Sequence, residues 1–465
     1  MDYIANAELF KTTFAVSEDG KKLIHKPPKR FKVFPFNSSQ ESTSPAVDSL
    51  DSLVGYYLSL IEGMMPKEVS LDSLLEQLEK ETKIEPGKEE LFRETVSQLF
   101  FENEQLRSLN LKMREYAPHP ESAETQIAKY LVDVLGDREV LQSWVTRAMN
   151  ALSARSNVFE RLVISKLESS EDKPKDWPHY TPVTTAVKDV FEQDFEYILS
   201  SETRTRDYLL PLLEFYFFTY TAQACLHLER LCDGNPTSVN PIYFCLEWEK
   251  TNQNRQCYTK GWKRLERAVG KLFAHVNTLE ILNQTQENGQ FDYIKLAHMA
   301  EQSAEIDSHI AGQIRILTQM YRAAIPNSYE MDAVTPKESS KSRTASEIRY
   351  LFDSVNAQFS DTDRQKNYKA YAGKFRKFCE NKYLKSRGRS GYMLNLSEET
   401  LIFLTKVCVK DQETMRLKDV FGEFERRGVF LDNISKEQVT QYFEKLNLIE
   451  KKSDSGDAKY VKRIL

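Results

Sequence analysis

The sequence predicts a mainly α-helical protein. Apolar residues recur at intervals of three and four over most of the 465 residues, whereas strictly alternating runs are few. The chain contains only 16 glycines, which disfavours a large sheet with many tight turns. Polar, proline-containing stretches divide the chain. We therefore predict a helical bundle or array, with an extended segment before it and a smaller module after it.

The first 36 residues are predicted to form an extended basic arm. The stretch GKKLIHKPPKRFKVFPF, residues 20–36, combines six basic residues with a Pro-Pro pair that disfavours helix. Residues 37–49 are poor in large apolar residues and predict a linker. From residue 50 to 325 we predict a helical scaffold, in which Ser70 caps a leucine-rich amphipathic helix.

Further helices are predicted between the Pro- and Asp-rich stretches SSEDKPKDWPHYTP and DGNPTSVNP. They are expected at 123–136, 138–167, 184–200, 203–232, 259–285 and 291–323. The segment 208–228 is long and apolar enough to resemble a membrane span. It contains Glu214, Gln223 and His227, so we interpret it as a helix buried in the protein core and expect no membrane partner.

The cysteines and known motifs give no catalytic or cofactor site. There are six cysteines without a Cys-x-x-Cys pair, and the N-terminus shows no secretory signal. We therefore expect buried free thiols in a protein of the reducing cytoplasm. The stretch from Cys225 to Cys257 with His227 fits no common zinc-ligand spacing. No nucleotide-binding or hydrolase motif occurs, so no cofactor, metal or catalytic residue is predicted.

Charge is distributed unevenly along the chain. The region Asp48–Gln105 contains 14 acidic and 5 basic residues, a net charge of −9. The region Arg364–Ser390 contains 10 basic residues and one acid, a net charge of +9. Such asymmetry indicates different electrostatic partners for the two regions. We expect the acidic region to contact protein, because its charge repels DNA.

The basic segment at residues 348–390, after a polar linker at 326–347, is a candidate for nucleic-acid binding. Its cations are interleaved with Tyr368, Tyr371, Phe375, Phe378 and Tyr383. We expect these aromatic side chains to dock a helix on the module that follows, with KSRGRSG as a flexible extension. The cations then face outward, either as a solvated surface or in contact with phosphates. The candidates are Lys366, Lys369, Lys374, Arg376, Lys377, Lys382, Lys385, Arg387 and Arg389.

Residues 391–465 predict three short helices followed by a β-hairpin, which is the element order of a winged helix. The helices are expected to begin at Ser397, near residue 416, and at Ser435, where Gln438 completes a capping-box pattern. Gly428 is expected to end the second helix.

The closing hairpin would be the wing of this module. Gly456 suits its turn, but Asp454 and Asp457 at the tip would repel phosphates. The module has 13 basic and 13 acidic residues, so it contacts either protein or DNA, and protein is favoured. Its DNA-binding candidates are Lys451, Lys452, Lys459 and Lys462.

The stretch LIEKKSDSGDAKYVKRIL, with LSEETLIFLTKVC ahead of it, resembles the DptG (DndG) family of DNA phosphorothioation-dependent restriction proteins. The stretches PIYFCLEWEKTNQNRQCYTKGWKRL and LFAHVNTLEILN are similar to the same family. The resemblance implies a bacterial defence system whose host DNA carries sulfur in its backbone. A complex with DptF-like and DptH-like partners would act on DNA lacking this mark. The motor and cleavage functions would belong to the partners, and the resemblance supplies no catalytic residues.

We therefore predict a non-catalytic, cytoplasmic scaffold subunit that docks double-stranded DNA or a partner protein. Two alternatives are kept open. A metal-dependent nuclease would need an acid and an acid-x-lysine on adjacent strands, and Asp454, Asp457 and Lys459 have the wrong spacing. A DNA-binding regulator of transcription would rarely need a helical scaffold as long as residues 50–325.

Overall fold

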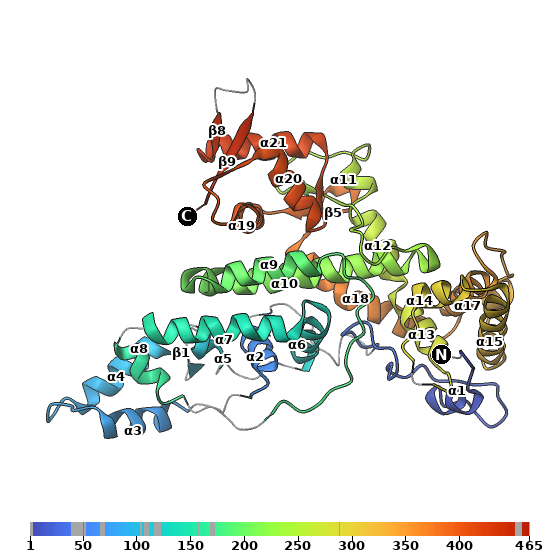
Figure 1. Ribbon diagram of the computed structural model, residues 1–465, viewed down its shortest axis with the longest axis horizontal. Helices are drawn as coiled ribbons and strands as arrows, with labels where there is room; N and C mark the ends of the chain where they lie inside the picture. Colours follow the sequence, from blue (N-terminus) through green and yellow to red (C-terminus); the bar gives the residue numbers. More distant parts are fainter. Residues whose placement is uncertain are drawn as a thin grey trace.

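A computed structural model describes residues 3–38, 50, 53–65, 70–102, 105–106, 111–115, 122–155, 158–167, 173–287, 289–451 and 458–464. Helices hold 61% of the chain and strands 8%, which confirms the mainly α-helical class. Figure 1 shows the elements arranged around one long helix, α10 (Glu202–Leu228), with the C-terminal elements above it. Within the described ranges, no helix has the length and apolar character needed to cross a bilayer.

The N-terminal segment packs into the helical core. Residues Ala7–Thr13 form helix α1, whose cap is the Asn6 side chain accepting from the Leu9 amide at 3.0 Å. Phe10 and Phe31 are each 1% exposed. The buried Glu280 carboxylate accepts the Phe31 amide at 3.1 Å. The prediction of an extended arm was therefore wrong for residues 7–13, because short-range capping and apolar burial outweigh the basic composition nearby.

One helical group packs below α10 in Figure 1, whereas α9 (Lys188–Leu199) lies at the level of α10 in this view. The lower group comprises α2 (Leu53–Glu62), α5 (Leu111–Glu115), α6 (Ser122–Val134) and α7 (Arg138–Arg155). A lobe with a separate small core extends from it and contains α3 (Leu71–Glu81), α4 (Glu89–Phe100), β1 (Phe101–Glu102), β2 (Gln105–Leu106) and α8 (Val158–Ile164). Ser70 caps α3 by accepting from the Ser73 amide at 3.2 Å, as predicted.

The polar residues of α10 explain why it is a core helix. Glu214 forms an ion pair with Lys382 at 2.8 Å. The Gln223 side chain exchanges two hydrogen bonds with the backbone of Asn240, at 2.9 and 2.7 Å. Because these buried groups have protein partners, the helix can be apolar on nearly all sides without contacting lipid. The interpretation of 208–228 as a buried helix is confirmed.

A second helical group lies toward the right-hand end of α10 in Figure 1, whereas α11 (Gln256–Thr259) lies above α10 beside the C-terminal elements. The group comprises α12 (Trp262–Gly270), α13 (Leu272–Leu282), α14 (Tyr293–Ala300), α15 (Ala304–Ala323), α16 (Tyr329–Asp332) and α17 (Arg343–Asp361). The predicted helix 259–285 is interrupted at Lys271. The predicted helix 291–323 is split where Ser303 caps α15. The predicted linker 326–347 contains α16 and the start of α17.

The C-terminal elements follow in the order α18 (Gln365–Lys382), β4 (Leu384–Ser386), β5 (Tyr392–Leu396), α19 (Glu398–Val409), β6 (Thr414–Arg416), α20 (Leu417–Arg426), β7 (Val429–Leu431), α21 (Asn433–Lys445), β8 (Ile449–Lys451) and β9 (Lys459–Lys462). One sheet has the order β6-β9-β8, with antiparallel pairs. Residues 452–457, which include the turn of the predicted wing, lie outside the described residues.

The other sheet joins the C-terminal elements to the middle of the chain. Its order is β4-β5-β3-β7, and strand β3 (Ile242–Leu246) is parallel to both of its neighbours. The C-terminal region therefore shares its sheet with the scaffold. The pairing of β3 with β5 could not be predicted from local sequence patterns, because well over a hundred residues separate the two strands.

Two helix boundaries of this region test the predicted caps. Ser397 caps α19 by accepting from the Thr400 amide at 3.1 Å, as predicted. The predicted cap at Ser435 was wrong: α21 begins earlier, and Asp432 accepts the Ser435 amide at 3.0 Å. The Ser435 hydroxyl is instead buried against the Glu249 carboxylate, at 2.9 Å.

Buried ion pairs tie the C-terminal elements to the scaffold. Arg427 follows α20 and pairs with Asp194 of α9 at 2.6 Å, with side chains that are 1% and 0% exposed. Asp194 also accepts the Tyr216 hydroxyl at 2.7 Å. Arg255, 5% exposed, pairs with both Glu249 and Asp432. Asp194 and Asp432 therefore gain these arginine partners only when scaffold and C-terminal elements are assembled together.

Candidate nucleic-acid interface

The aromatic face of α18 packs against the central helices. The Phe378 ring lies 4.8 Å from Phe217, and the Phe375 ring 6.0 Å from Phe218, both on α10. The Tyr371 ring lies 5.2 Å from that of Phe273 on α13. The expectation that these aromatics dock α18 on the following module was therefore wrong. They pack α18 against α10 and α13.

Several candidate cations of α18 have internal partners. Arg376 pairs with Glu266 of α12 at 2.8 Å and with Glu380 at 3.0 Å. Lys382 pairs with Glu214, as described above. Lys374 is half-buried and has an interaction partner within the protein. These three cations position α18 beside its neighbours.

The stretch KSRGRSG was expected to be a flexible extension, but it forms the hairpin between β4 and β5. The Arg387 guanidinium donates to the backbone carbonyls of Leu246, at 2.8 Å, and Glu249, at 2.9 Å. Lys385 pairs with Glu247 at 3.2 Å. Arg387 and Lys385 therefore hold the hairpin against the end of β3, which removes them from the set of available phosphate ligands.

The remaining cations of this segment are exposed. Lys366, Lys369 and Lys377 lie on one side of α18, opposite its buried aromatic face, and Arg389 lies at the tip of the hairpin. Among the described residues, no carboxylate forms an ion pair with any of these four.

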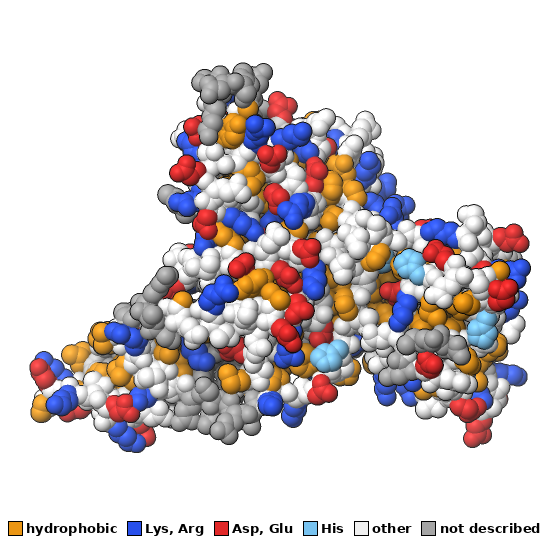
Figure 2. Space-filling view, viewed as in Figure 1, with side chains coloured by type: hydrophobic (Ala, Val, Ile, Leu, Met, Phe, Trp, Pro, Cys, Tyr) orange, Lys and Arg blue, Asp and Glu red, His pale blue; other side chains and the backbone are white. Residues whose placement is uncertain are grey.

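Sequence reasoning missed three further cations on the neighbouring helix. Lys260, Lys263 and Arg267 precede or belong to α12, and all three are exposed without an ion-paired carboxylate among the described residues. Arg376 joins these elements, because it pairs with Glu266 of α12 and lies 6.0 Å from the Tyr392 ring of β5. Blue side chains gather along this side, over α11 and α12, in Figure 2. The signal was present in GWKRLERAVGK, which holds four basic residues and one acid.

We name this region the α12–α18 basic surface. It consists of Lys260, Lys263, Arg267, Lys366, Lys369, Lys377 and Arg389. The exposed lysines of α18 run from Lys366 to Lys377, so at about 1.5 Å per residue they span roughly 17 Å. That length matches about five phosphates along one strand of a duplex, at roughly 3.4 Å each.

The lysines of the predicted wing are not part of this surface. Lys459 pairs with Glu444 at 2.9 Å, whereas Lys451 and Lys462 are exposed on β8 and β9. Figure 1 places β8 and β9 on the side of the C-terminal elements opposite α11. Lys452 lies outside the described residues. On α21, exposed Glu437 and Glu444 oppose any phosphate contact.

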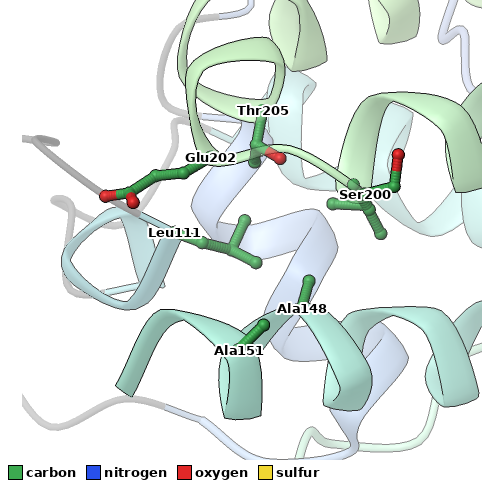
Figure 3. Close-up of a pocket in the computed structure, with 7 residues that line it drawn as sticks. Leu111, Ala148, Ala151, Ser200, Glu202 and Thr205 are labelled. Atoms are coloured by element: carbon green, nitrogen blue, oxygen red, sulfur yellow. The ribbon is translucent and has the colours of Figure 1, made fainter. Parts of the chain in front are cut away.

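A small cavity elsewhere in the protein offers no alternative site. It measures about 30 Å³ and lies between α5, α7 and the turn from α9 to α10, where Leu111, Ala148 and Thr205 line it (Figure 3). The Thr205 hydroxyl already donates to the Ile198 carbonyl at 3.0 Å. The cavity can hold a water or two but is far smaller than the pockets that take organic ligands, which begin at about 300 Å³.

All six cysteines are buried free thiols, as predicted. Burial raises the pKa of the Cys232 and Cys408 thiols to about 12, which disfavours the nucleophilic thiolate. The pKa of Cys245 is lowered instead, by a hydrogen bond with Cys257 and by the nearby Arg387 guanidinium. Among the described residues, no three His, Cys, Asp or Glu side chains are grouped closely enough to hold a metal ion.

Comparison with known proteins returned no match to this chain, either among family models or among curated proteins. Function is therefore inferred from the basic surface and from the sequence resemblance noted above.

Proposed function

We propose that this protein is a non-catalytic subunit of a bacterial complex that restricts DNA lacking the phosphorothioate mark, and that it holds duplex DNA on the α12–α18 basic surface. The main support for the DNA contact is that the cations of residues 364–390 fall into two groups. Some form ion pairs within the protein, whereas Lys366, Lys369, Lys377 and Arg389 are exposed, as are three more cations near α12.

The partner of this surface is the phosphate backbone of a duplex. Single-strand binders present several exposed aromatic rings on which successive bases stack. Here Tyr371, Phe375 and Phe378 of α18 are buried, and Tyr392, near Arg376, is a single exposed ring at 42%. Lysine and arginine on rigid helices attract phosphates irrespective of sequence. The subunit therefore contributes affinity for DNA, and recognition of the sulfur mark is left to other parts of the complex.

The C-terminal elements serve as a docking unit for a partner protein in this proposal. The order α19, β6, α20, α21, β8, β9, with β6 paired to β9, supports the winged-helix assignment. The helix that would enter the major groove is α21, and its exposed Glu437 and Glu444 favour a protein partner over DNA.

The acidic lobe around α3 and α4 is proposed as the contact for the DptF-like and DptH-like subunits in the cytoplasm. Residues 70–102 contain nine acidic and four basic residues. Leu91 and Leu99 of α4 are 60% and 47% exposed, which leaves apolar side chains available within an acidic surface. Apolar groups rimmed by charge are typical of protein interfaces.

Co-purification with the proteins encoded beside this gene tests the proposal, in parallel with binding to a short duplex. Lys366, Lys369, Lys377 and Arg389 changed together to Ala should lose DNA binding and keep the partners. Leu91→Gln with Leu99→Gln should lose the partners and keep DNA. Ile24→Gln with Ile316→Gln, at two other exposed apolar positions, is the control. Metal-dependent DNA cleavage by the purified chain alone would contradict the non-catalytic assignment.

A further inference from the structure

An open groove lies where strands β3 and β5 end. It has a volume of about 550 Å³ and is lined by Glu247, Trp248, Lys385, Ser397, Glu398 and Glu399. Because β3 and β5 run parallel, the residues that follow them meet at one edge of the sheet, with the Glu247 amide donating to the Leu396 carbonyl at 3.1 Å. Such carboxyl edges are common places for ligands.

Trp248 lines this groove and forms an aromatic pair with Tyr442 behind it. Trp248 is 38% exposed, and its ring lies 5.0 Å from that of Tyr442 on α21. The Tyr442 hydroxyl donates to Glu398 at 2.9 Å. Trp177 and Trp262 are 8% and 2% exposed, so the exposure of Trp248 is not a general feature of the tryptophans here. A large ring held at the surface by a neighbouring ring is suited to contact with a ligand.

The charges around the aromatic pair favour a cation. Three carboxylates line the groove, and Lys385 pairs with Glu247 alone, at 3.2 Å. Neither Glu398 nor Glu399 has an ion-paired cation among the described residues. A guanidinium or ammonium group over Trp248 would meet both the ring face and the carboxylates. Phosphate groups would be repelled, so this groove is unsuited to DNA.

We propose that this groove binds an arginine- or lysine-bearing segment of a protein partner, with the cation between Trp248 and the two carboxylates of α19. A protein segment is favoured over a small cation because Leu446, 43% exposed, lies one helical turn beyond Tyr442. Leu446 therefore offers an apolar contact beside the aromatic pair, beyond the reach of a single charged group. Tryptophan and tyrosine side chains are the usual anchors of such interfaces.

The probe for the test is a fluorescein-labelled peptide, acetyl-Leu-Arg-Leu-Arg-Leu-amide, titrated with the full-length protein and followed by fluorescence anisotropy. A second peptide with citrulline in place of arginine keeps the shape and removes the charge. Trp248→Ala should weaken binding of the arginine peptide about 2- to 30-fold, the range of cation–π contacts. Glu398→Gln with Glu399→Gln should weaken it as well, and the citrulline peptide should bind poorly to every variant.

The control is Glu301→Gln with Glu305→Gln, which removes two exposed glutamates just before and within the first turn of α15. This change matches the α19 variant in number and residue type and lies outside every surface proposed above, so general electrostatic attraction of a basic peptide would respond to both equally. Unchanged affinity in the control supports the groove. Equal weakening in both Gln variants, unchanged affinity in Trp248→Ala, or no binding of the arginine peptide at millimolar concentration overturns the proposal. Thermal melting of each variant separates loss of the groove from loss of the fold.

Discussion

At the scale of single residues, the buried charges decide which parts of the chain belong together. Arg427 donates to Asp194 and to the carbonyl of Val407, and it also pairs with Glu423 at 2.8 Å. Its pKa is well above the usual value, because the neighbouring anions outweigh the cost of burial. Arg427 thus links α9, α19 and α20 through one side chain.

Arg427→Met should lower the free energy of unfolding by about 3–5 kcal/mol, because Asp194 is then left as a buried charge without its main partner. Urea unfolding followed by circular dichroism measures this change. Arg426→Met, one residue earlier, is the matched control, since Arg426 is half-exposed and pairs only with Glu423 among described residues. If both substitutions lower the free energy of unfolding equally, the buried ion pair stabilises the fold no more than the exposed one does, which contradicts this prediction.

The pH dependence of stability should report on His275. This ring is fully buried, stacks on Phe352 at 4.3 Å and hydrogen bonds to the Tyr293 hydroxyl at 3.1 Å. Burial, with smaller contributions from Lys271 and His227, lowers its pKa to about 3. The folded state therefore keeps the ring neutral, while the unfolded chain protonates it below about pH 6.5. The stabilisation is complete above pH 6.5 and is lost as the pH falls toward 3.

His275→Gln removes this titration. Between pH 7 and pH 5 the unmodified protein should lose about 2 kcal/mol more stability than the variant does. Urea unfolding at the two pH values measures both losses. Identical losses would mean that the ring is accessible to protons in the folded state.

Local residue patterns predicted single features well and long-range contacts poorly. The caps at Ser70 and Ser397 follow from side-chain oxygens next to amphipathic helices, and both are present. The roles of Arg376 and Arg387 could not be predicted, because their partners Glu266 and Leu246 are more than a hundred residues away in the chain. A cation count cannot distinguish a paired arginine from an exposed lysine.

At the scale of elements, strand β3 is the feature that the sequence concealed. It has five residues, lies in the middle of a helical region, and becomes the parallel neighbour of both β5 and β7. A run of five apolar or aromatic residues is compatible with either helix or strand. The winged-helix pattern was read from local periodicity alone, and periodicity gives no information about a strand supplied from a distant segment.

The C-terminal residues 391–465 should not fold stably on their own. Without β3, strand β7 has no partner and β5 loses both neighbours, because β4 is also outside this fragment. Arg427 and Asp432 would lose Asp194 and Arg255. The isolated fragment should show poorly dispersed amide resonances, and co-expression with residues 1–390 should restore a soluble complex. Cooperative unfolding of the fragment alone would contradict this account.

At the scale of the whole molecule, acidic and basic regions lie on different parts of one helical framework. Figure 1 shows α3 and α4 at one end and α12 and α18 near the other helical group, with α10 between them. The mainly helical class and the burial of α10 were predictable from composition and apolar spacing. The basic surface was predicted only in part, since α12 contributes cations that lie about a hundred residues before α18.

The salt dependence of DNA affinity tests the central claim most directly. If the α12–α18 basic surface neutralises about six phosphates, log affinity for a short duplex should fall against log salt with a slope of roughly −5. Changing Lys366, Lys369, Lys377 and Arg389 to Ala should reduce the slope to about −2 and weaken binding equally for unrelated sequences. Changing Lys80, Lys83, Lys173 and Lys175, four exposed lysines elsewhere, should leave the slope near −5. If the surface variant keeps the affinity and slope of the unmodified protein, the basic surface does not bind DNA.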